Sequence, residues 1–184
     1  MMGKFKLDRD DTVLIIIDLQ ERLMNAMKYR DKVYNNTNIL LSTAKQFNIP
    51  VVLSEQYPRG LGPTVAEIKA NLPEEIIYME KQSFSLCGEG LLDKLGNLQK
   101  KSAIVCGTET HVCVFQTVRD LIDAGYYVHV VSDAVCSRFT ENYINGLALM
   151  ADMGAVITNT ETVVFDLLEC AGTPEFKAIS PLIK

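Results

Sequence analysis

One stretch, residues 101–114 with the sequence KSAIVCGTETHVCV, limits what this chain can fold into. Its apolar run Ser102–Cys106 predicts a strand that is buried on both faces. We expect the strand to break at Gly107 and the chain to pass through three polar residues into a helix that runs toward Gly125. A buried strand that leads directly into a helix is the building unit of parallel α/β sheets.

Cys113 falls in the first turn of that predicted helix. Backbone amides without partners and the positive end of the helix dipole favour a thiolate over a thiol at such a position. Cys113 is therefore the leading candidate for a nucleophile. The alternative is that it is a small buried apolar residue, as most free cysteines are.

Apolar segments recur along the chain and predict six strands, at residues 12–17, 51–54, 75–79, 102–106, 127–132 and 155–158. Between them, periodic or capped segments predict helices at residues 31–47, 64–71, 89–95, 140–153 and 161–170, besides the one that carries Cys113. Asp31 is the expected cap of the first helix. The inner side of helix 140–153 is expected to carry Leu147, Leu149, Met150 and Met153.

Six strands that alternate with helices predict one α/β domain over residues 1–184. The expected architecture has three layers, α/β/α, around a doubly wound parallel sheet of Rossmann-like order 3-2-1-4-5-6. A nucleotide-binding Rossmann protein is a weak alternative, because no GxGxxG motif follows the first strand.

The composition suits one globular domain: 48% of the 184 residues are hydrophobic, 22% are charged, and the net charge is -5. A modest acidic balance without a basic run argues against nucleic acid and against an anionic membrane as partners. The polar N-terminus and the lack of a long apolar run predict a cytoplasmic protein. The five cysteines are scattered without a CxxC motif, so neither a disulfide framework nor a zinc finger is expected.

Three chemically active side chains stand at the ends of predicted strands. Asp18 follows the first strand, Lys81 follows the third, and Cys113 opens the helix after the fourth. Ligands of doubly wound sheets bind outside the carboxyl ends of the strands, where the strand order reverses, so we expect these residues to converge there. Asp18 could instead cap a loop or helix, and Lys81 could form a solvated pair with Glu80.

The two histidines argue against a Cys–His dyad. His111 lies two residues before Cys113 on the predicted helix, so the two do not share a face, and His129 lies inside a strand. A carboxylate must then accept the thiol proton, and a lysine nearby would stabilise both anions.

Three separated motifs resemble the isochorismatase-like cysteine hydrolase superfamily, which includes nicotinamidases and N-carbamoylsarcosine amidohydrolases. They are Asp18-Leu-Gln20, the segment in which Lys81 precedes Ser83-Phe84-Ser85, and the run GTETHVCV at residues 107–114. The resemblance covers about residues 10 to 170. The loop EQYPRGLG at residues 55–62 is most similar to the isochorismatase-domain branch, whose members mostly lack a defined substrate.

The resemblance implies that Asp18, Lys81 and Cys113 form a catalytic triad. It also implies a non-proline cis peptide bond at Thr108–Glu109 and an oxyanion hole made by the backbone amides of Glu109 and Cys113.

The implied activity is hydrolysis of a small amide or imide. Asp18 would take the thiol proton, Cys113 would attack a carbonyl, and a thioester would form and be hydrolysed by water. Four further residues could line the pocket, or could equally be packing or solvent-exposed residues: Gln20, Tyr57, Phe84 and His111.

Two departures from the family pattern reduce the range of expected substrates. Nicotinamidases hold a metal with an Asp and histidines after the second strand, but here Glu55-Gln56-Tyr57 contains no histidine, so we expect no metal and no cofactor. Glu109 replaces a small residue, and its carboxylate would disfavour acidic substrates unless it is turned away or protonated. Isochorismatases proper cleave a vinyl ether and generally do not need the cysteine, so Cys113 favours an amide or imide.

A catalytically silent, oligomeric binding or interaction protein on the same fold is the alternative function. The complete triad favours the hydrolase. Family members are usually dimers, tetramers or larger, so we expect a homo-oligomer, with residues 140–153 or 174–182 as candidate contact segments.

Overall fold

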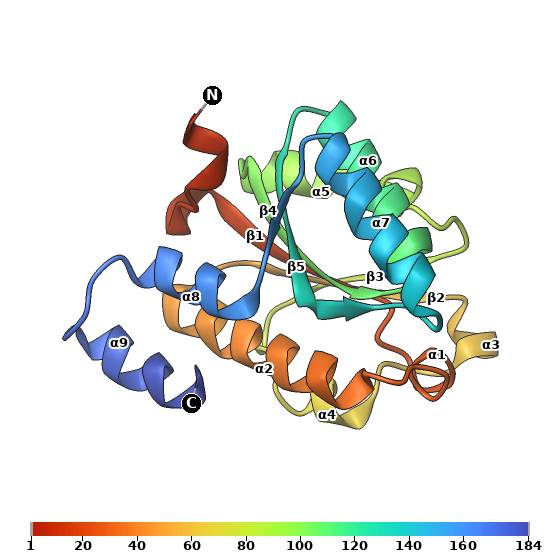
Figure 1. The fold of residues 1–184 in the computed structure, drawn as a ribbon, viewed down its shortest axis with the longest axis horizontal. Helices are drawn as coiled ribbons and strands as arrows, with labels where there is room; N and C mark the ends of the chain where they lie inside the picture. The colour runs from red at the N-terminus through yellow and green to blue at the C-terminus, as the bar shows by residue number, and fades with distance from the viewer. Residues whose placement is uncertain (1, 184) are drawn as a thin grey trace.

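A six-stranded, fully parallel sheet forms the centre of the molecule (Figure 1). The computed structural model describes residues 2–183. The strand order is β3-β2-β1-β4-β5-β6, which confirms the predicted fold. The strands are β1 (Thr12–Ile17), β2 (Val51–Gln56), β3 (Ile77–Lys81), β4 (Ser102–Thr108), β5 (Tyr127–Cys136) and β6 (Val156–Thr158).

Helices cover both faces of the sheet, so the fold has three layers (Figure 1). One face carries α2 (Arg30–Phe47), α4 (Ala66–Lys69), α8 (Thr160–Leu168) and α9 (Pro174–Ile179). The other carries α5 (Leu91–Leu98), α6 (Phe115–Asp123) and α7 (Thr140–Asp152). The short helices α1 (Glu21–Met24) and α3 (Pro58–Leu61) lie in the connections between strands, as does a 3₁₀ turn at Leu86–Glu89. Further 3₁₀ turns lie before β1, at Met2–Phe5 and Arg9–Asp11, and after α9, at Ser180–Ile183.

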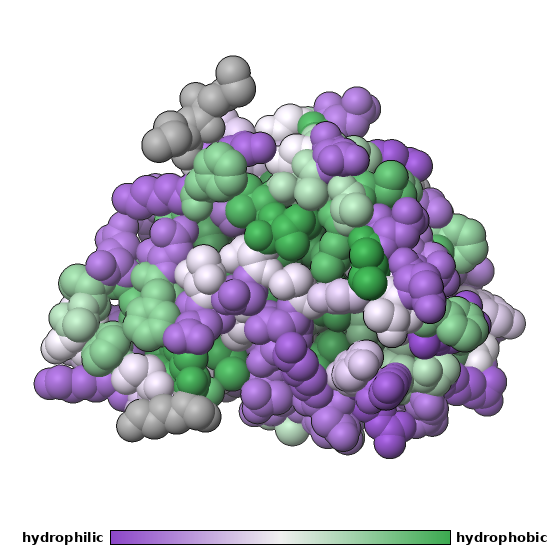
Figure 2. All heavy atoms as spheres, in the orientation of Figure 1, coloured by the Kyte–Doolittle hydropathy of each residue, from purple (hydrophilic) through white to green (hydrophobic). Residues whose placement is uncertain are grey.

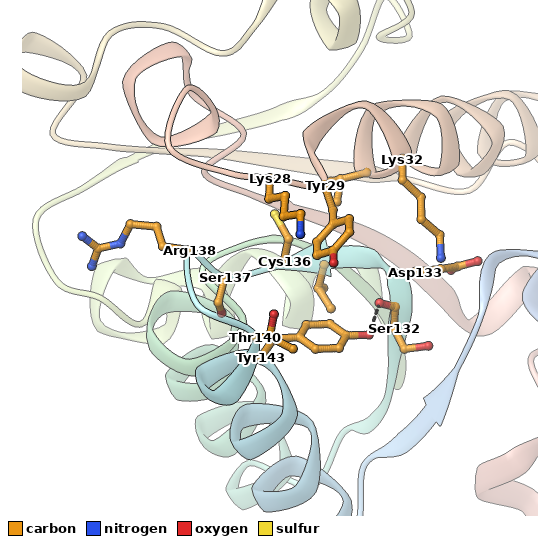
Figure 3. Close-up of a pocket in the computed structure, with 12 residues that line it drawn as sticks. Lys28, Tyr29, Lys32, Ser132, Asp133, Cys136, Ser137, Arg138, Thr140 and Tyr143 are labelled. Atoms are coloured by element: carbon orange, nitrogen blue, oxygen red, sulfur yellow. Dashed lines mark hydrogen bonds between the residues drawn. The ribbon is translucent and has the colours of Figure 1, made fainter.

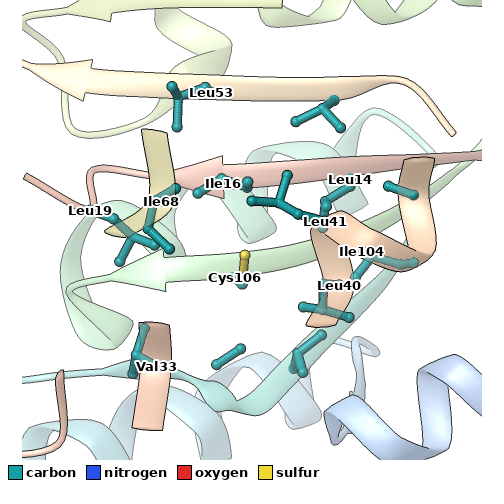
Figure 4. Close-up of a cluster of buried hydrophobic side chains, with 14 of the residues drawn as sticks. Leu14, Ile16, Leu19, Val33, Leu40, Leu41, Leu53, Ile68, Ile104 and Cys106 are labelled. Carbon is teal, nitrogen blue, oxygen red and sulfur yellow. The ribbon is translucent and has the colours of Figure 1, made fainter. Parts of the chain in front are cut away.

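The side chains of β1 alternate between the two cores, because successive residues of a strand point to opposite faces. Leu14 and Ile16 pack into the core under α2, which Figure 4 shows with Leu40, Ile68 and other apolar residues around them. The odd-numbered residues of β1 pack under α5, α6 and α7. All six residues of this strand are buried, which explains why its sequence is a continuous apolar run rather than an alternating one.

We predicted that the fourth strand ends at Gly107. In the structure, Gly107 lies inside that strand. The strand β4 continues to Thr108, and Gly107 pairs with Ile17 of β1. Gly107 has a φ of 122°, and a Cβ atom there would lie 2.0 Å from the carbonyl oxygen of Ile17. A glycine is therefore required here because the backbones of β4 and β1 lie too close for a side chain. The strand continues past it to the segment that holds Cys113.

Other element boundaries also differ from the sequence-based prediction. Helix α2 begins at Arg30 with Tyr29 as its N-cap, so Asp31 lies in the first turn and is not the cap. In α7, Met150 is buried as predicted, but Leu149 is 41% exposed. The cap lies two residues earlier than predicted, and Leu149 lies at the edge of the buried face; a 3.6-residue period alone resolves neither difference.

Strand β6 is short and leaves much of β5 without a neighbour on that side. It pairs with residues 129–131 of β5 only, so Ser132–Cys136 extend beyond it. Hydrophobic side chains gather over α7 and β6 on the face shown in Figure 2, and Ile144 of α7 is 59% exposed. Within residues 2–183, no helix has both the length and the apolar character needed to cross a bilayer.

Candidate active site

The ends of three strands bring Asp18, Lys81 and Cys113 to one place. Asp18 directly follows β1 in a left-handed backbone conformation with a φ of 50°. Lys81 is the last residue of β3, two strands away, so its side chain reaches Asp18 across the end of β2. Cys113 lies in a single π-helical turn, Thr110–Val114, between β4 and α6.

Asp18 and Lys81 form a fully buried ion pair. Oδ2 of Asp18 lies 2.7 Å from Nζ of Lys81, and neither side chain is exposed. The hydroxyl of Ser54 donates a 2.7 Å hydrogen bond to the other carboxylate oxygen, Oδ1. The Thr108 hydroxyl donates to the backbone carbonyl of Asp18 at 2.8 Å, which fixes the left-handed turn against β4. The carboxylate is therefore held by contacts from β2 and β3 and its backbone by one from β4.

The Lys81 ammonium group is held by three neighbours besides Asp18. It donates to Oε1 of Gln56 at 2.6 Å and to the carbonyl oxygens of Phe84 at 3.1 Å and Ser83 at 3.3 Å. An ammonium group has three protons, so these acceptors and Asp18 account for all of its hydrogen-bonding capacity. A lysine held in this way supplies a fixed positive charge.

Cys113 lies beside this pair as a thiol. The residue is only 6% exposed. The pKa of Cys113 is raised to about 12, chiefly by burial and then by the Asp18 carboxylate, while the Lys81 ammonium group opposes the shift. The prediction of a thiolate-favouring setting is therefore wrong for the resting protein, because desolvation outweighs the effect of the helix end. A base must remove the thiol proton, and Asp18 is close enough to influence it.

The segment between β4 and Cys113 is anchored through Glu109. The peptide bond between Thr108 and Glu109 is cis, at the position that the family resemblance implied. The Glu109 carboxylate accepts hydrogen bonds from the backbone N–H of Arg138 at 3.0 Å and from its Nε at 3.2 Å. Glu109 is thus turned toward Arg138 and its charge is compensated. Among residues 2–183, its own carbonyl accepts from the amides of Val112 and Val114, and Cys113 is not among its donors.

The four residues named as pocket candidates occupy different environments. The amide nitrogen of Gln20 donates to the carbonyls of Gln56 and Gly62, so this buried side chain joins two loops. Tyr57 and Phe84 are 49% and 53% exposed. His111 contacts the Ser137 hydroxyl at 3.0 Å through Nδ1.

The loop after β2 is tied by Glu55. Its carboxylate accepts from the backbone amide of Thr64 at 2.6 Å and from the Tyr78 hydroxyl at 2.9 Å. These hydrogen bonds lower the pKa of Glu55 against the opposing effect of burial, which is the largest single influence. In the part of the chain that the structure describes, no cluster of three or more His, Cys, Asp or Glu side chains is arranged to hold a metal ion.

Sequence reasoning missed three residues that hold the site: Ser54, Gln56 and Arg138. Ser54 and Gln56 stand two positions apart at the end of β2, and alternate residues of a strand share a face. Two polar residues in that spacing, after an apolar run, were a usable signal. No sequence signal pointed to Arg138, because its pairing with Glu109 depends on how far β5 extends.

Comparison with known proteins identifies the family of this chain. Residues 12–162 match the isochorismatase domain. The chain belongs to the isochorismatase family. A secreted isochorismatase effector of Phytophthora sojae is 44% identical, in an alignment that covers 94% of this chain and 84% of the effector.

Solved isochorismatase-like structures share the whole fold. The MAR1 ribonuclease of Caenorhabditis elegans has a TM-score of 0.92 at 34% identity, covering 97% of this chain and 92% of that one. YcaC of Escherichia coli, described as an octameric hydrolase of unknown specificity, has a TM-score of 0.89 at 26% identity, with 97% and 89% covered. YcaC of Pseudomonas aeruginosa, described with hexane-2,5-diol and covalent acrylamide, has a TM-score of 0.88 at 26% identity, with 96% and 91% covered.

Proposed function

We propose that this isochorismatase-family protein is a cysteine hydrolase that cleaves a small, uncharged amide or imide through a thioester on Cys113. The observation that carries the proposal is the buried Asp18–Lys81 pair at 2.7 Å beside the Cys113 thiol. Burying two charges is costly unless their geometry is held by further contacts, as it is here. Covalent acrylamide in the YcaC relative is in keeping with a nucleophile in this family.

In the first half of the reaction, the Asp18 carboxylate takes the proton from Sγ of Cys113 as the sulfur attacks the substrate carbonyl. Transfer during attack suits a thiol whose pKa is about 12, because little free thiolate exists at neutral pH. The positive charge of Lys81 stabilises both the carboxylate and the developing thiolate. Backbone amides of Glu109 and Cys113 are the proposed donors to the tetrahedral oxyanion.

In the second half, the protonated Asp18 gives its proton to the leaving nitrogen, and the C–N bond breaks to leave a thioester on Cys113. Asp18 then takes a proton from a water molecule, which attacks the thioester carbonyl. The C–S bond then breaks, the acid product leaves, and Asp18 returns the proton to the Cys113 sulfur. The residue that acts as base in the first half is thus available as base again.

The charge balance supports a neutral substrate. Asp18 is neutralised by Lys81, and Glu109 is neutralised by Arg138. An uncompensated charge on the substrate would meet no free partner among these four groups. The MAR1 relative is named a ribonuclease, but the net charge of -5 does not favour RNA here.

Assembly and location are also proposals. The octameric YcaC relative and the exposed Ile144 on α7 support a homo-oligomer, which light scattering would measure. Cytoplasmic location stays a prediction, and it contrasts with the secreted effector of Phytophthora sojae. Fractionation of cells that express the protein tests it.

The deciding experiment incubates wild type and Cys113→Ala with succinimide, nicotinamide and the anionic N-carbamoylsarcosine, and follows the products by mass spectrometry. Succinimide should open to succinamic acid and nicotinamide should release ammonia, whereas the anionic member should be the poorest substrate. Acid quenching followed by peptide mass spectrometry should locate an acyl group on Cys113 for a productive substrate. Turnover that persists in Cys113→Ala would disprove the thioester route. A wild-type protein that hydrolyses no panel member, and binds some of them without acylation, would favour the non-catalytic binding protein.

A further inference from the structure

A cavity of about 270 Å³ has none of the triad residues in its lining (Figure 3). It opens between the start of α2, the part of β5 that β6 leaves unpaired, and the start of α7. Residues from these three elements line it: Lys28, Tyr29, Lys32, Val33, Ser132, Asp133, Val135, Cys136, Ser137, Arg138, Thr140 and Tyr143. The volume suits a ligand of about the size of a substituted benzene ring.

The interior of the cavity is mainly apolar. Val33, Val135 and Cys136 are buried side chains that form part of its lining. The Tyr143 ring adds a fixed aromatic wall, because its hydroxyl donates a 2.8 Å hydrogen bond to the carbonyl of Ser132 (Figure 3). This lining favours a ligand with an apolar body.

The mouth of the cavity is positively charged. Lys28 and Lys32 line it from the start of α2, and within residues 2–183 neither forms an ion pair. Arg138 extends away from the cavity in Figure 3 and is paired with Glu109. The positive end of the α2 dipole adds to the same potential.

Asp133 is the one carboxylate among the lining residues, and it is already engaged. Its Oδ1 accepts hydrogen bonds from both the backbone amide and the hydroxyl of Thr160 at 2.8 Å. Those bonds tie β5 to α8. The two lysines therefore keep a net positive charge at the mouth after Asp133 is counted.

We propose that this cavity is a binding site for a small carboxylate with an apolar or aromatic body, separate from the triad. The carboxylate is held by Lys28 and Lys32 and the body contacts Val33, Val135 and the Tyr143 ring. The site goes beyond the proposed hydrolase, because its occupant is anionic whereas the proposed substrate is neutral. Hydrolysis of an amide also yields a carboxylate, so a reaction product could belong to the same chemical class as this ligand.

The test uses 4-fluorobenzoate as probe and follows its binding by ¹⁹F NMR and calorimetry, with 4-fluorobenzamide and 4-fluorobenzylamine as neutral and cationic matches. The expected result is saturable binding of the carboxylate alone. The double variant Lys28→Ala/Lys32→Ala should weaken it by about tenfold or more, because charge-assisted hydrogen bonds are lost. The matched control, Lys94→Ala/Lys101→Ala, changes the net charge equally at exposed sites and should leave binding unchanged.

Cys113→Ala separates this proposal from the proposed function. Binding of 4-fluorobenzoate that is retained in Cys113→Ala and weakened in the Lys28/Lys32 variant supports the cavity, whether or not the wild type hydrolyses an amide. Loss of binding in Cys113→Ala would place the probe over the triad and overturn the proposal. Equal binding of the amide or amine, or an unchanged affinity in the lysine variant, would overturn it as well.

Discussion

The Asp18 carboxylate lies 2.7 Å from the Lys81 ammonium group, and neither side chain exposes any surface. Each charge is therefore stable in the interior only while the other is present. Removing one partner of such a pair leaves an uncompensated charge out of contact with water.

Lys81→Met tests this dependence through stability. The variant should lose about 3 to 5 kcal/mol of unfolding free energy, because it leaves Asp18 buried without its cation. The double variant Asp18→Asn/Lys81→Met should recover at least half of that loss. Urea unfolding measures both, with the exposed Lys94→Met as control. A Lys81→Met protein that is as stable as the control would contradict the buried pair.

Asp18→Asn separates reactivity from catalysis through pH. Burial and the Asp18 charge both raise the pKa of Cys113, which is about 12, so wild-type labelling by iodoacetamide should be slow at pH 8 and rise about tenfold per pH unit below that pKa. Removing the Asp18 charge lowers the pKa, so labelling at pH 8 should accelerate. Turnover should instead fall by about 10² to 10⁴, since the proposed general base is gone.

Peptide mapping measures the extent of labelling at each cysteine, and the exposed Cys170 is the internal reference. Slower labelling of Cys113 in a folded Asp18→Asn protein would contradict the dominance of the Asp18 charge over the pKa of the thiol. The pH at which labelling reaches half its maximum, compared between wild type and variant, separates a change in thiol pKa from loss of a base that assists the attack.

Gln56→Met tests the acceptor that holds Lys81. The substitution removes a 2.6 Å hydrogen bond from the ammonium group and one from the Gln56 side chain to the Gln82 carbonyl. We expect a loss of about 1 to 3 kcal/mol in stability, with a fall in turnover larger than any change in substrate affinity. Gln82→Met is the matched control, because the exposed Gln82 contributes only backbone atoms to these contacts. Equal effects of the two variants would show that the Gln56 side chain does not position Lys81.

Gly107→Ala tests the close approach of β4 to β1. A Cβ atom at this position would lie 2.0 Å from the Ile17 carbonyl oxygen, so the variant should fail to fold or should unfold at much lower denaturant concentration. Gly96→Ala in α5 adds the same methyl group where no heavy atom lies within 4 Å. That control should be stabilised by up to about 1 kcal/mol. A stable Gly107→Ala protein with normal thermal melting would refute the strained contact.

The sequence was sufficient to predict the sheet order and the meeting of Asp18, Lys81 and Cys113. Parallel strands place their carboxyl ends at one edge, and apolar runs such as Thr12–Ile17 locate those ends to within two residues for every strand except β5. The resemblance to a known family added the role of each residue, and those roles remain proposals.

Other features depended on contacts between distant segments and could not be predicted. The raised pKa of Cys113 follows from burial by side chains that pack only after folding. Gly107 reads as a strand break until its neighbour Ile17 is known. Arg138 reaches Glu109 because β5 continues beyond Ser132, where the apolar pattern gave no reason to extend it.

Lys81 reaches Asp18 over the end of a strand that contributes neither of them. The ion pair therefore exists only when β1, β2 and β3 are all in register, and Cys113 joins it only when β4 is added. The proposed catalytic activity would therefore depend on the assembly of two thirds of the sheet, and a refolding experiment that follows turnover would time the completion of its non-local contacts.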